Sequence, residues 1–155
     1  MDAAISTHLV RAIELAGSAR AHGNHPFGAV LVAGDGTVVE AENTVVTAND
    51  PTGHAETNLV RLSAAALTPE QLISSTLYTS TEPCAMCSAA IFWAGIGCVV
   101  YALSEEALIA MLPAGSGDAL ALPCREVFAR GARPTEVIGP VDLPGATTVH
   151  DGFWS

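Results

Sequence analysis

The chain has 155 residues and is half hydrophobic, which fits one folded domain spanning residues 1–155 and excludes a disordered chain. Its net charge is −10 and all six basic residues are arginines, so lysine Schiff-base chemistry and a phosphate-binding P-loop are excluded. The one local basic cluster, Arg125, Arg130 and Arg133, is more typical of a solvated helix face, so we expect no nucleic-acid partner.

The first third of the chain predicts a helix followed by a hairpin. Hydrophobic residues at helical spacing indicate a helix that starts near Ile5 and ends near Gly23-Asn24. Two apolar runs, over 28–33 and 37–40, flank the sequence Gly34-Asp35-Gly36. An Asp-Gly pair between such runs is typical of a β-hairpin turn.

A second helix is expected after the turn cluster at 49–53. Leu59, Leu62 and Ala66 continue the face of Ala55 at helical spacing. Strands and helices then alternate to the end of the chain. We expect a strand over 76–80, a helix opened by Pro83, a buried strand around Val99, a helix over 105–111, a loop over 113–123, a helix over 124–132, an edge strand over 136–141 and a terminal segment over 147–155. This order indicates a layered α/β domain with a mixed sheet.

Residues 83–104 contain no charged side chain and are long enough to cross a bilayer. Cys84, Ser88, Gly95 and Gly97 interrupt the stretch, and its helix-like half gives way to a strand-like run. We therefore expect a buried helix, a turn and a buried strand, with no membrane partner. The start of the chain lacks the pattern of a secretion signal, and free cysteines suit a reducing compartment, so we expect a cytoplasmic protein.

Two short segments carry the chemistry. His54 supplies an imidazole, and Cys84 and Cys87 supply two thiolates. Three nitrogen and sulfur ligands leave a fourth position of a zinc ion open, which is the pattern of a catalytic site. A redox pair, or a closed site that recruits Cys98 and Cys124, is the alternative, but Cys98 falls in an apolar strand-like run where a buried free cysteine is ordinary.

The spacing suits this metal site. Cys84 and Cys87 are three residues apart in the predicted first turn of a helix, so both sulfurs project from one face. The partial positive charge of a helix N-terminus favours their thiolate forms. Glu56 follows His54 by two residues, so it cannot act as a second ligand on the same face, but it can reach the open position and move protons there.

Three stretches of the sequence resemble a known family. They are residues 25–30 (His-Pro-Phe-Gly-Ala-Val), 49–56 (ending in His-Ala-Glu) and 77–87 (ending in Pro-Cys-Ala-Met-Cys), the last continuing to Trp93-Ala94. The chain resembles the cytidine deaminase superfamily, and within it the small bacterial guanine deaminases. Residues 94–100 are also similar to fungal cytosine deaminase. The resemblance implies a three-layer α/β/α fold around a five-stranded mixed sheet, and a homodimer.

The resemblance also implies roles for individual residues. His54, Cys84 and Cys87 match the zinc ligands, and Glu56 matches the residue that shuttles protons. Asn43 matches an asparagine that hydrogen-bonds the base, Phe27 an aromatic wall, and the backbone groups of Ala55 (N–H) and Glu82 (carbonyl) match positions that hold the base. Without the resemblance, Asn43 is a turn or strand-end residue and Phe27 a core residue.

The chain departs from the guanine deaminase pattern after Tyr101. Asp118 is either the acidic residue that reads the base or a solvated loop residue. The C-terminal tail, about residues 142–155, ends in Phe153 and Trp154. We expect this tail to close the active site of its own or of a partner subunit, because such chemistry benefits from the exclusion of water, and the alternative is a core or dimer anchor.

The sequence thus predicts a zinc-dependent hydrolytic deaminase of a free amino-nucleobase, a small neutral molecule, with guanine first. Cytosine or an aminotriazine is an alternative substrate. A tRNA adenosine deaminase shares the same motifs, but the charge of −10 and the absence of an arginine at 93–96 oppose it. A non-catalytic, zinc-stabilised binding protein is the remaining alternative, and such a protein has no need for Glu56.

Overall fold

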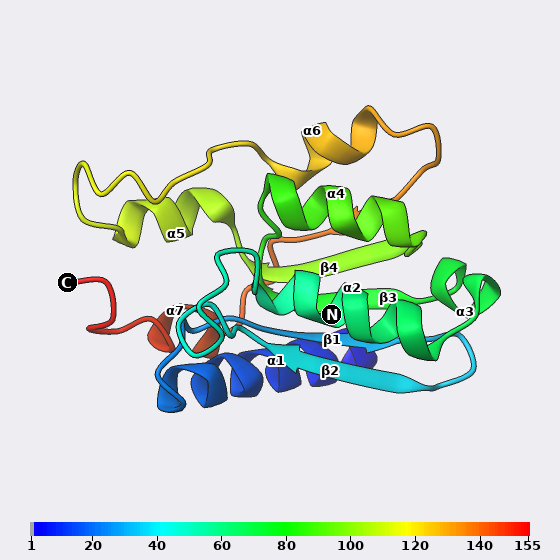
Figure 1. Cartoon of the computed structure of the whole chain (residues 1–155), viewed down its shortest axis with the longest axis horizontal. Coiled ribbons are helices and arrows are strands. Elements are labelled where there is room, and N and C mark those ends of the chain that lie inside the picture. Colours follow the sequence, from blue (N-terminus) through cyan, green and yellow to red (C-terminus); the bar gives the residue numbers. More distant parts are fainter. Residues whose placement is uncertain (1) are drawn as a thin grey trace.

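The computed structural model describes residues 2–155, which fold around one mixed sheet (Figure 1). Its five strands lie in the order β2-β1-β3-β4-β5. Their bounds are β1 Gly28–Val32, β2 Val38–Glu42, β3 Thr76–Thr81, β4 Cys98–Leu103 and β5 Glu136–Ile138. β1 runs antiparallel to both β2 and β3, whereas β3, β4 and β5 run parallel. The predicted hairpin and the five-stranded mixed sheet are confirmed.

Helices cover both faces of the sheet and give the expected three layers (Figure 1). The helices are α1 Ala3–Ala21, α2 Ala55–Ala66, α3 Pro69–Ile73, α4 Ala85–Ala94, α5 Glu105–Met111, α6 Cys124–Ala129 and α7 Gly145–Thr148. α1 and α7 pack on one face, and α2, α4 and α6 lie on the other. No helix among residues 2–155 has the length and apolar character needed to cross a membrane.

β1 and β4 are apolar on both sides because both faces of the sheet are covered. In β1, Ala29 and Leu31 belong to the core under α2 and α4, and Val30 belongs to the core under α1. β4 alternates in the same way, with Val99 on the first side and Val100 on the second. Continuous apolar runs are typical of such strands, which explains the uncharged stretch that suggested a membrane span.

The buried face of α2 differs from the prediction. Leu62 and Ala66 are exposed, and Ser63 continues the buried face of Ala55 and Leu59. Residues four apart lie on the same side of a helix, and here the small Ser63 occupies the place at which the hydrophobicity pattern suggested an apolar residue. The expectation for Leu62 and Ala66 was therefore wrong.

Other differences concern the ends of elements. A short helix that the sequence analysis did not predict, α3, lies before β3 and starts with a capping box between Thr68 and Gln71. The helix expected at Pro83 begins at Ala85. The last strand ends at Ile138, because Gly139 and Pro140 follow, and the helix that starts at Cys124 is shorter than expected. The terminal segment starts with α7, two residues earlier than expected.

Gly28 allows α1 to pack directly on β1. A methyl group at Gly28 would collide with Ala12 O and lie 2.6 Å from Ala16 N. We expect Gly28→Ala to lower the free energy of unfolding by about 1–3 kcal/mol, as overpacking does. Gly17→Ala, whose methyl group meets only Val149 at 4.0 Å, should leave stability unchanged or raise it by about 0.5–1 kcal/mol. Urea unfolding of both variants tests this, and equal effects would contradict it.

Candidate active site

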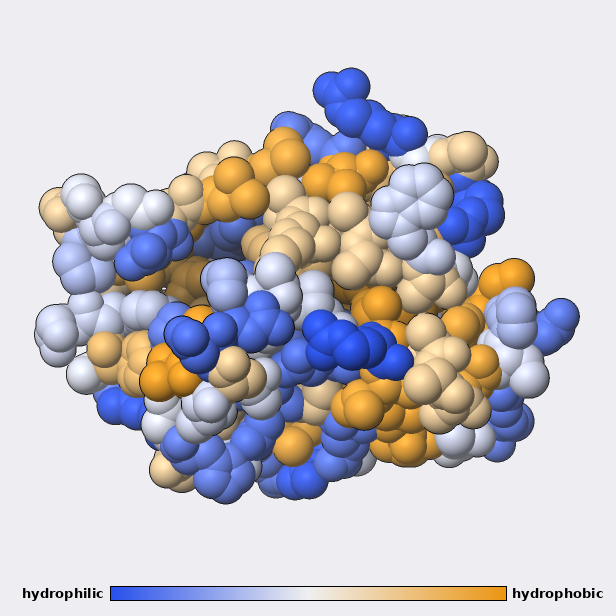
Figure 2. Space-filling model, in the orientation of Figure 1, coloured by the Kyte–Doolittle hydropathy of each residue, from blue (hydrophilic) through white to orange (hydrophobic). Residues whose placement is uncertain are grey.

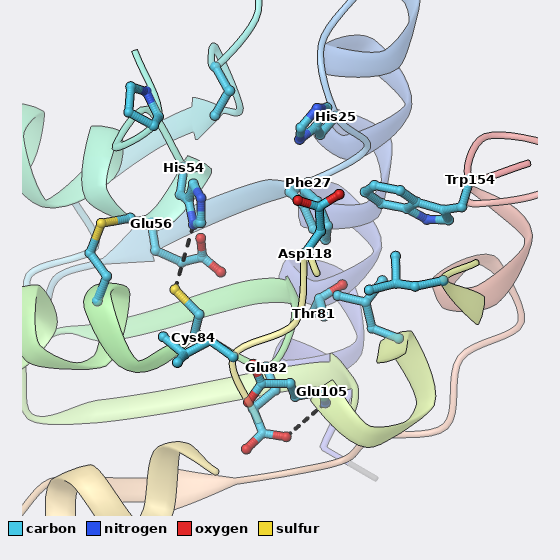
Figure 3. Close-up of a pocket in the computed structure, with 16 residues that line it drawn as sticks. His25, Phe27, His54, Glu56, Thr81, Glu82, Cys84, Glu105, Asp118 and Trp154 are labelled. Carbon is cyan, nitrogen blue, oxygen red and sulfur yellow. Dashed lines mark hydrogen bonds between the residues drawn. The ribbon is translucent and has the colours of Figure 1, made fainter. Parts of the chain in front are cut away.

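Two helices begin at the site and place the predicted metal ligands. His54 is the N-cap of α2 and Cys84 is the N-cap of α4, and neither side chain makes a capping hydrogen bond. Cys87 lies in the first turn of α4, which packs against α2. The three side chains therefore meet at one point, where their ligand atoms all lie within 4.8 Å of one another (Figure 3).

The donor set fits a zinc ion. The Nδ1 atom of His54 lies 3.6 Å from Cys84 Sγ and 3.4 Å from Cys87 Sγ. Tetrahedral zinc with ordinary bond lengths separates a nitrogen and a sulfur ligand by about 3.5 Å. His54, Cys84 and Cys87 could thus hold zinc through one nitrogen and two sulfurs, with no fourth protein ligand among the clustered groups of residues 2–155. The expected zinc cofactor agrees with this geometry.

The protonation states of the three ligand groups depend on one another. The neighbouring Cys87 thiol and the His54 ring lower the pKa of Cys84 to about 4. The same interaction with Cys84, together with burial, raises the pKa of Cys87. Hydrogen bonding to Cys84 raises the pKa of His54. The three groups are thus coupled to one another, and a cation bound between them would favour the deprotonated form of each.

Glu56 lies beside these groups and is buried. Its Oε1 accepts a hydrogen bond of 2.9 Å from the Thr79 hydroxyl, and its Oε2 lies 3.5 Å from Cys87 Sγ. Burial, reinforced by the negative charge of Cys84, raises the pKa of Glu56. The side chain is therefore held in one orientation at the edge of the metal site, with a carboxyl group that binds a proton more readily than usual.

The site opens into a cavity of about 500 Å³, which includes the hollow visible on the left of Figure 2. Its lining residues are His25, Phe27, Val45, Pro51, His54, Glu56, Thr81, Glu82, Cys84, Met86, Glu105, Leu108, Leu112, Asp118, Leu120 and Trp154. Four of them are acidic, and no lysine or arginine of the described chain is among them. The cavity thus combines apolar and aromatic walls with a negative charge.

The structure brings only some of the predicted binding residues into this cavity. Phe27, Glu82, Asp118 and Trp154 line it, although Asp118 is otherwise exposed (Figure 3). Asn43, Ala55 and Phe153 are not among the lining residues. Their roles toward a bound base stay predictions.

Asn43 and Ala55 lie close to the site in sequence and are both buried. Asn43 follows the end of β2, and its Oδ1 accepts a hydrogen bond of 3.1 Å from Val45 N. Ala55 is the first residue of α2, directly after His54. Asn43 Oδ1 thus accepts one hydrogen bond from the backbone of its own loop, and the amide nitrogen has no hydrogen-bond partner among the described residues.

The C-terminal tail covers the cavity of its own chain. Trp154 lines the cavity and donates a hydrogen bond of 3.1 Å from Nε1 to Nδ1 of the buried His150. The His150 ring also contacts Phe27, at a centroid distance of 5.5 Å. Phe153 packs edge-on against His25 and lies under the Arg20 guanidinium. The tail is therefore fastened to the rest of the chain by aromatic contacts and by a hydrogen bond of 2.9 Å from Arg20 Nη1 to Val149 O.

The sequence did not predict the role of the Glu82 side chain or any role for Glu105. Both Glu82 oxygens accept backbone hydrogen bonds, at 3.0 Å from Cys124 N and 2.9 Å from Glu105 N. This carboxylate fastens the starts of α5 and α6 beside the cavity. Burial, with the nearby charges of Glu82 and Cys84, raises the pKa of Glu105 to about 7. The sequence predicted the helix that begins after Ser104, but it did not predict that Glu105 lines the cavity.

We expect His54→Ala and Cys84→Ser each to abolish stable zinc binding. Loss of a direct ligand should lower zinc affinity by more than the roughly 10–100-fold that loss of an outer partner costs. Cys98→Ser is the matched control, because Cys98 lies in β4 and outside the ligand cluster. Zinc content after gel filtration, measured by mass spectrometry, should be one ion per chain in the control. Equal zinc content in all variants would show that the metal is held elsewhere.

The tail should loosen in acid. Burial, with the positive charge of Arg20, lowers the pKa of His150 from 6.5 to about 4, so the folded state holds this ring neutral. Between these pH values the unfolded chain binds a proton that the folded chain does not, and stability therefore falls as the pH falls from 6.5 to about 4. Protonation of Nδ1 also breaks the bond from Trp154.

His150→Asn keeps an acceptor near Nδ1 but does not titrate, so it should reduce this acid-dependent loss. The fluorescence of Trp154 in a Trp93→Phe background, followed with urea unfolding across this pH range, measures both effects. Glu70→Gln, at an exposed position on α3, is the control and should behave like the parent chain. An unchanged acid loss in His150→Asn would assign the effect to another group.

Comparison with known proteins agrees with this geometry. Residues 3–103 match the family model described as the cytidine and deoxycytidylate deaminase zinc-binding region. A probable cytosine deaminase of Schizosaccharomyces pombe is 40% identical over 148 residues, which cover 95% of this chain and 90% of that protein. A tRNA-specific adenosine deaminase of Haemophilus influenzae is 40% identical over 95 residues, 61% of this chain and 55% of that protein.

The guanine deaminase of Bacillus subtilis is similar in both sequence and structure. The sequences are 45% identical over 97 residues, 62% of each chain. Its X-ray structure superposes with a TM-score of 0.64 and 42% identity, over 71% of this chain and 69% of that one. The expected resemblance to guanine and cytosine deaminases is confirmed. The chain therefore belongs to the cytidine and deoxycytidylate deaminase family of zinc-binding, hydrolytic enzymes.

Proposed function

We propose that this protein is a zinc-dependent hydrolytic deaminase of a free amino-nucleobase, with guanine as the first candidate. The proposal rests on the observation that the candidate metal ligands and Glu56 line the same cavity. The His54–Cys84–Cys87 cluster and the Glu56 carboxyl face the same cavity, whose walls include Phe27 (Figure 3). A flat aromatic base with an exocyclic amine fits that combination of a metal, a proton carrier and aromatic walls.

Each group would have a separate role in the reaction. When zinc is bound, it lowers the pKa of a water molecule and so supplies a nucleophile at neutral pH. The water oxygen bonds to the ring carbon, and the bond from that carbon to the amine breaks, which releases ammonia. Glu56 accepts a proton from the water and returns protons to a ring nitrogen and to the leaving amine. The Thr79 hydroxyl keeps the carboxyl turned toward the metal site.

Other residues would orient the base. Phe27 and Trp154 provide aromatic walls, and their ring centroids lie 6.0 Å apart at the tail side of the cavity. Asn43 and the backbone N–H of Ala55 would hold polar atoms of the ring, and the Glu82 carbonyl would hold the departing amine. The tail carrying Phe153 and Trp154 would exclude water during the reaction.

The charge of the cavity supports a neutral small molecule over a nucleic acid. Phosphate groups bind where arginine or lysine side chains neutralise them. Among the described residues the cavity lining has four acidic residues and no lysine or arginine, and the whole chain has a net charge of −10. A tRNA substrate would meet repulsion both at the cavity and over the surface, despite the similarity to tRNA deaminases.

Cytosine is the second candidate, because the similarity to the probable cytosine deaminase extends over more of the chain than the similarity to the guanine deaminase. The match to the probable cytosine deaminase covers 95% of this chain, and so includes most of the region after Tyr101. The match to the guanine deaminase sequence covers 62% of the chain. The region after Tyr101 supplies Glu105, Asp118 and Trp154 to the cavity, so it bears on the choice of base.

We further infer a cytoplasmic homodimer. Exposed apolar side chains of α2, α3 and α4, namely Leu62, Ile73 and Trp93, lie on one helical layer of the molecule. Figure 2 shows hydrophobic residues gathered over these helices. Such a surface is suited to association with a second copy. In the single chain the tail reaches its own cavity, so closure does not require an exchanged tail.

An ammonia-release panel on zinc-loaded protein tests the function. The panel includes guanine, cytosine, adenine, isoguanine and ammeline, the nucleosides guanosine and cytidine, and a tRNA anticodon stem. We expect turnover of at least one free base, and none of the RNA, because of the acidic, lysine-free site. Activity on RNA with no activity on any free base would contradict the proposal.

Replacement of Glu56 separates an enzyme from a zinc-stabilised binding protein. Glu56→Gln keeps the shape of the side chain but cannot carry protons, so we expect zinc to be retained and kcat to fall by about 10²–10⁴-fold. Glu70→Gln, at an exposed position on α3, is the control and should keep full activity. Ammonia release by Glu56→Gln at the parental rate would remove Glu56 from the mechanism.

A further inference from the structure

Two buried side-chain oxygens beside the cavity have no hydrogen-bond partner among the described residues. They are Oγ1 of Thr81 and Oε2 of Glu105. The exposed fractions of these residues are 2% and 8%, and both residues line the cavity. A buried polar atom without a partner is costly, so such atoms in a native site indicate a ligand or an ordered water.

Glu105 differs in this respect from the other buried glutamates of the cavity. Glu56 uses its oxygens toward Thr79 and Cys87. Glu82 uses both of its oxygens to fasten the backbone of α5 and α6. Glu105 is itself held in place by the second of these contacts, through its own N–H. It thus has a fixed backbone and a side-chain oxygen that remains available.

The topology places Thr81 and Glu105 at the same edge of the sheet. Thr81 is the last residue of β3 and pairs in register with Leu103, the last residue of the parallel strand β4. Glu105 opens α5 two residues after Leu103. The ends of parallel strands form the usual binding edge of an open α/β sheet. Figure 3 shows both residues on the side of the cavity that also carries Glu82.

We propose that Glu105 and Thr81 bind the unsubstituted ring nitrogen of a free base, and thereby make the enzyme select free bases over nucleosides. The carboxylate accepts the ring N–H, and the hydroxyl donates to the acceptor atom next to it. Cytosine offers N1–H beside O2, and guanine offers N9–H beside N3. In a nucleoside this nitrogen carries the sugar and has no proton to donate. This inference rests on the proposed function.

Ring-methylated bases test the assignment without the bulk of a sugar. The kcat/KM values of cytosine and 1-methylcytosine, and of guanine and 9-methylguanine, are measured on zinc-loaded protein. A site that must hydrogen-bond its substrate rejects an analogue without the donor strongly, so we expect a preference of at least about 100-fold for the unmethylated base. The preference should lie mostly in KM.

Glu105→Ala and Glu105→Gln should reduce this preference to less than about 10-fold, because the charged acceptor is lost. Thr81→Val should lower kcat/KM for the unmethylated base, because the donor to O2 or N3 is lost. Glu106→Gln, the exposed neighbour on the same helix, is the matched control and should keep the parental ratio. A purely structural role would slow both members of each pair equally and leave the ratio unchanged.

The outcomes separate this inference from the proposed function. A parent enzyme that deaminates a free base but does not distinguish it from its methylated form overturns the inference alone. The same holds if Glu105→Ala keeps the parental ratio, which would leave ordered water as the partner of Oε2. A parent enzyme that acts on none of these bases overturns both the proposed function and the inference.

Discussion

The site depends on the convergence of two helix N-termini. α2 and α4 pack against each other, and their N-cap residues are His54 and Cys84 instead of the usual hydroxyl, carboxylate or amide residues. Neither side chain satisfies its own helix, so both are free to bind a metal. Hydrogen bonds with the Cys87 thiol and the His54 ring lower the pKa of Cys84, and the partial positive charge of a helix N-terminus also favours a thiolate. Local helix physics and metal chemistry thus favour the same geometry.

Glu82, two residues before Cys84, links the metal centre to the helices that line the rest of the cavity. Its carboxylate accepts the first N–H groups of α5 and α6, which fixes the segments after β4 against the end of β3. The tail then covers the cavity from the other side through His150 and Trp154. The pocket beside this metal centre is thereby lined both by residues of the matched region 3–103 and by residues after it, from Glu105 to Trp154.

Sequence alone predicted what depends on local pattern: the hairpin, the order of strands and helices, and the ligand set. It could not predict contacts between distant segments. The role of the Glu82 side chain and the burial of Glu105 and His150 arise only when elements far apart in the chain meet. The exposure of Leu62 follows from where α2 is covered, which periodicity does not specify. The position of Trp154 over its own cavity was one of two possibilities that the sequence left open.

The central claim is that water replaces an amine of a free base at this site. The most direct measurement runs the reaction in ¹⁸O-labelled water with the base that the zinc-loaded protein turns over fastest. Each ammonia released should be matched by one product molecule that carries one ¹⁸O atom, and removal of zinc should stop both. Ammonia release without label in the product, or equal release by the metal-free protein, would contradict the account.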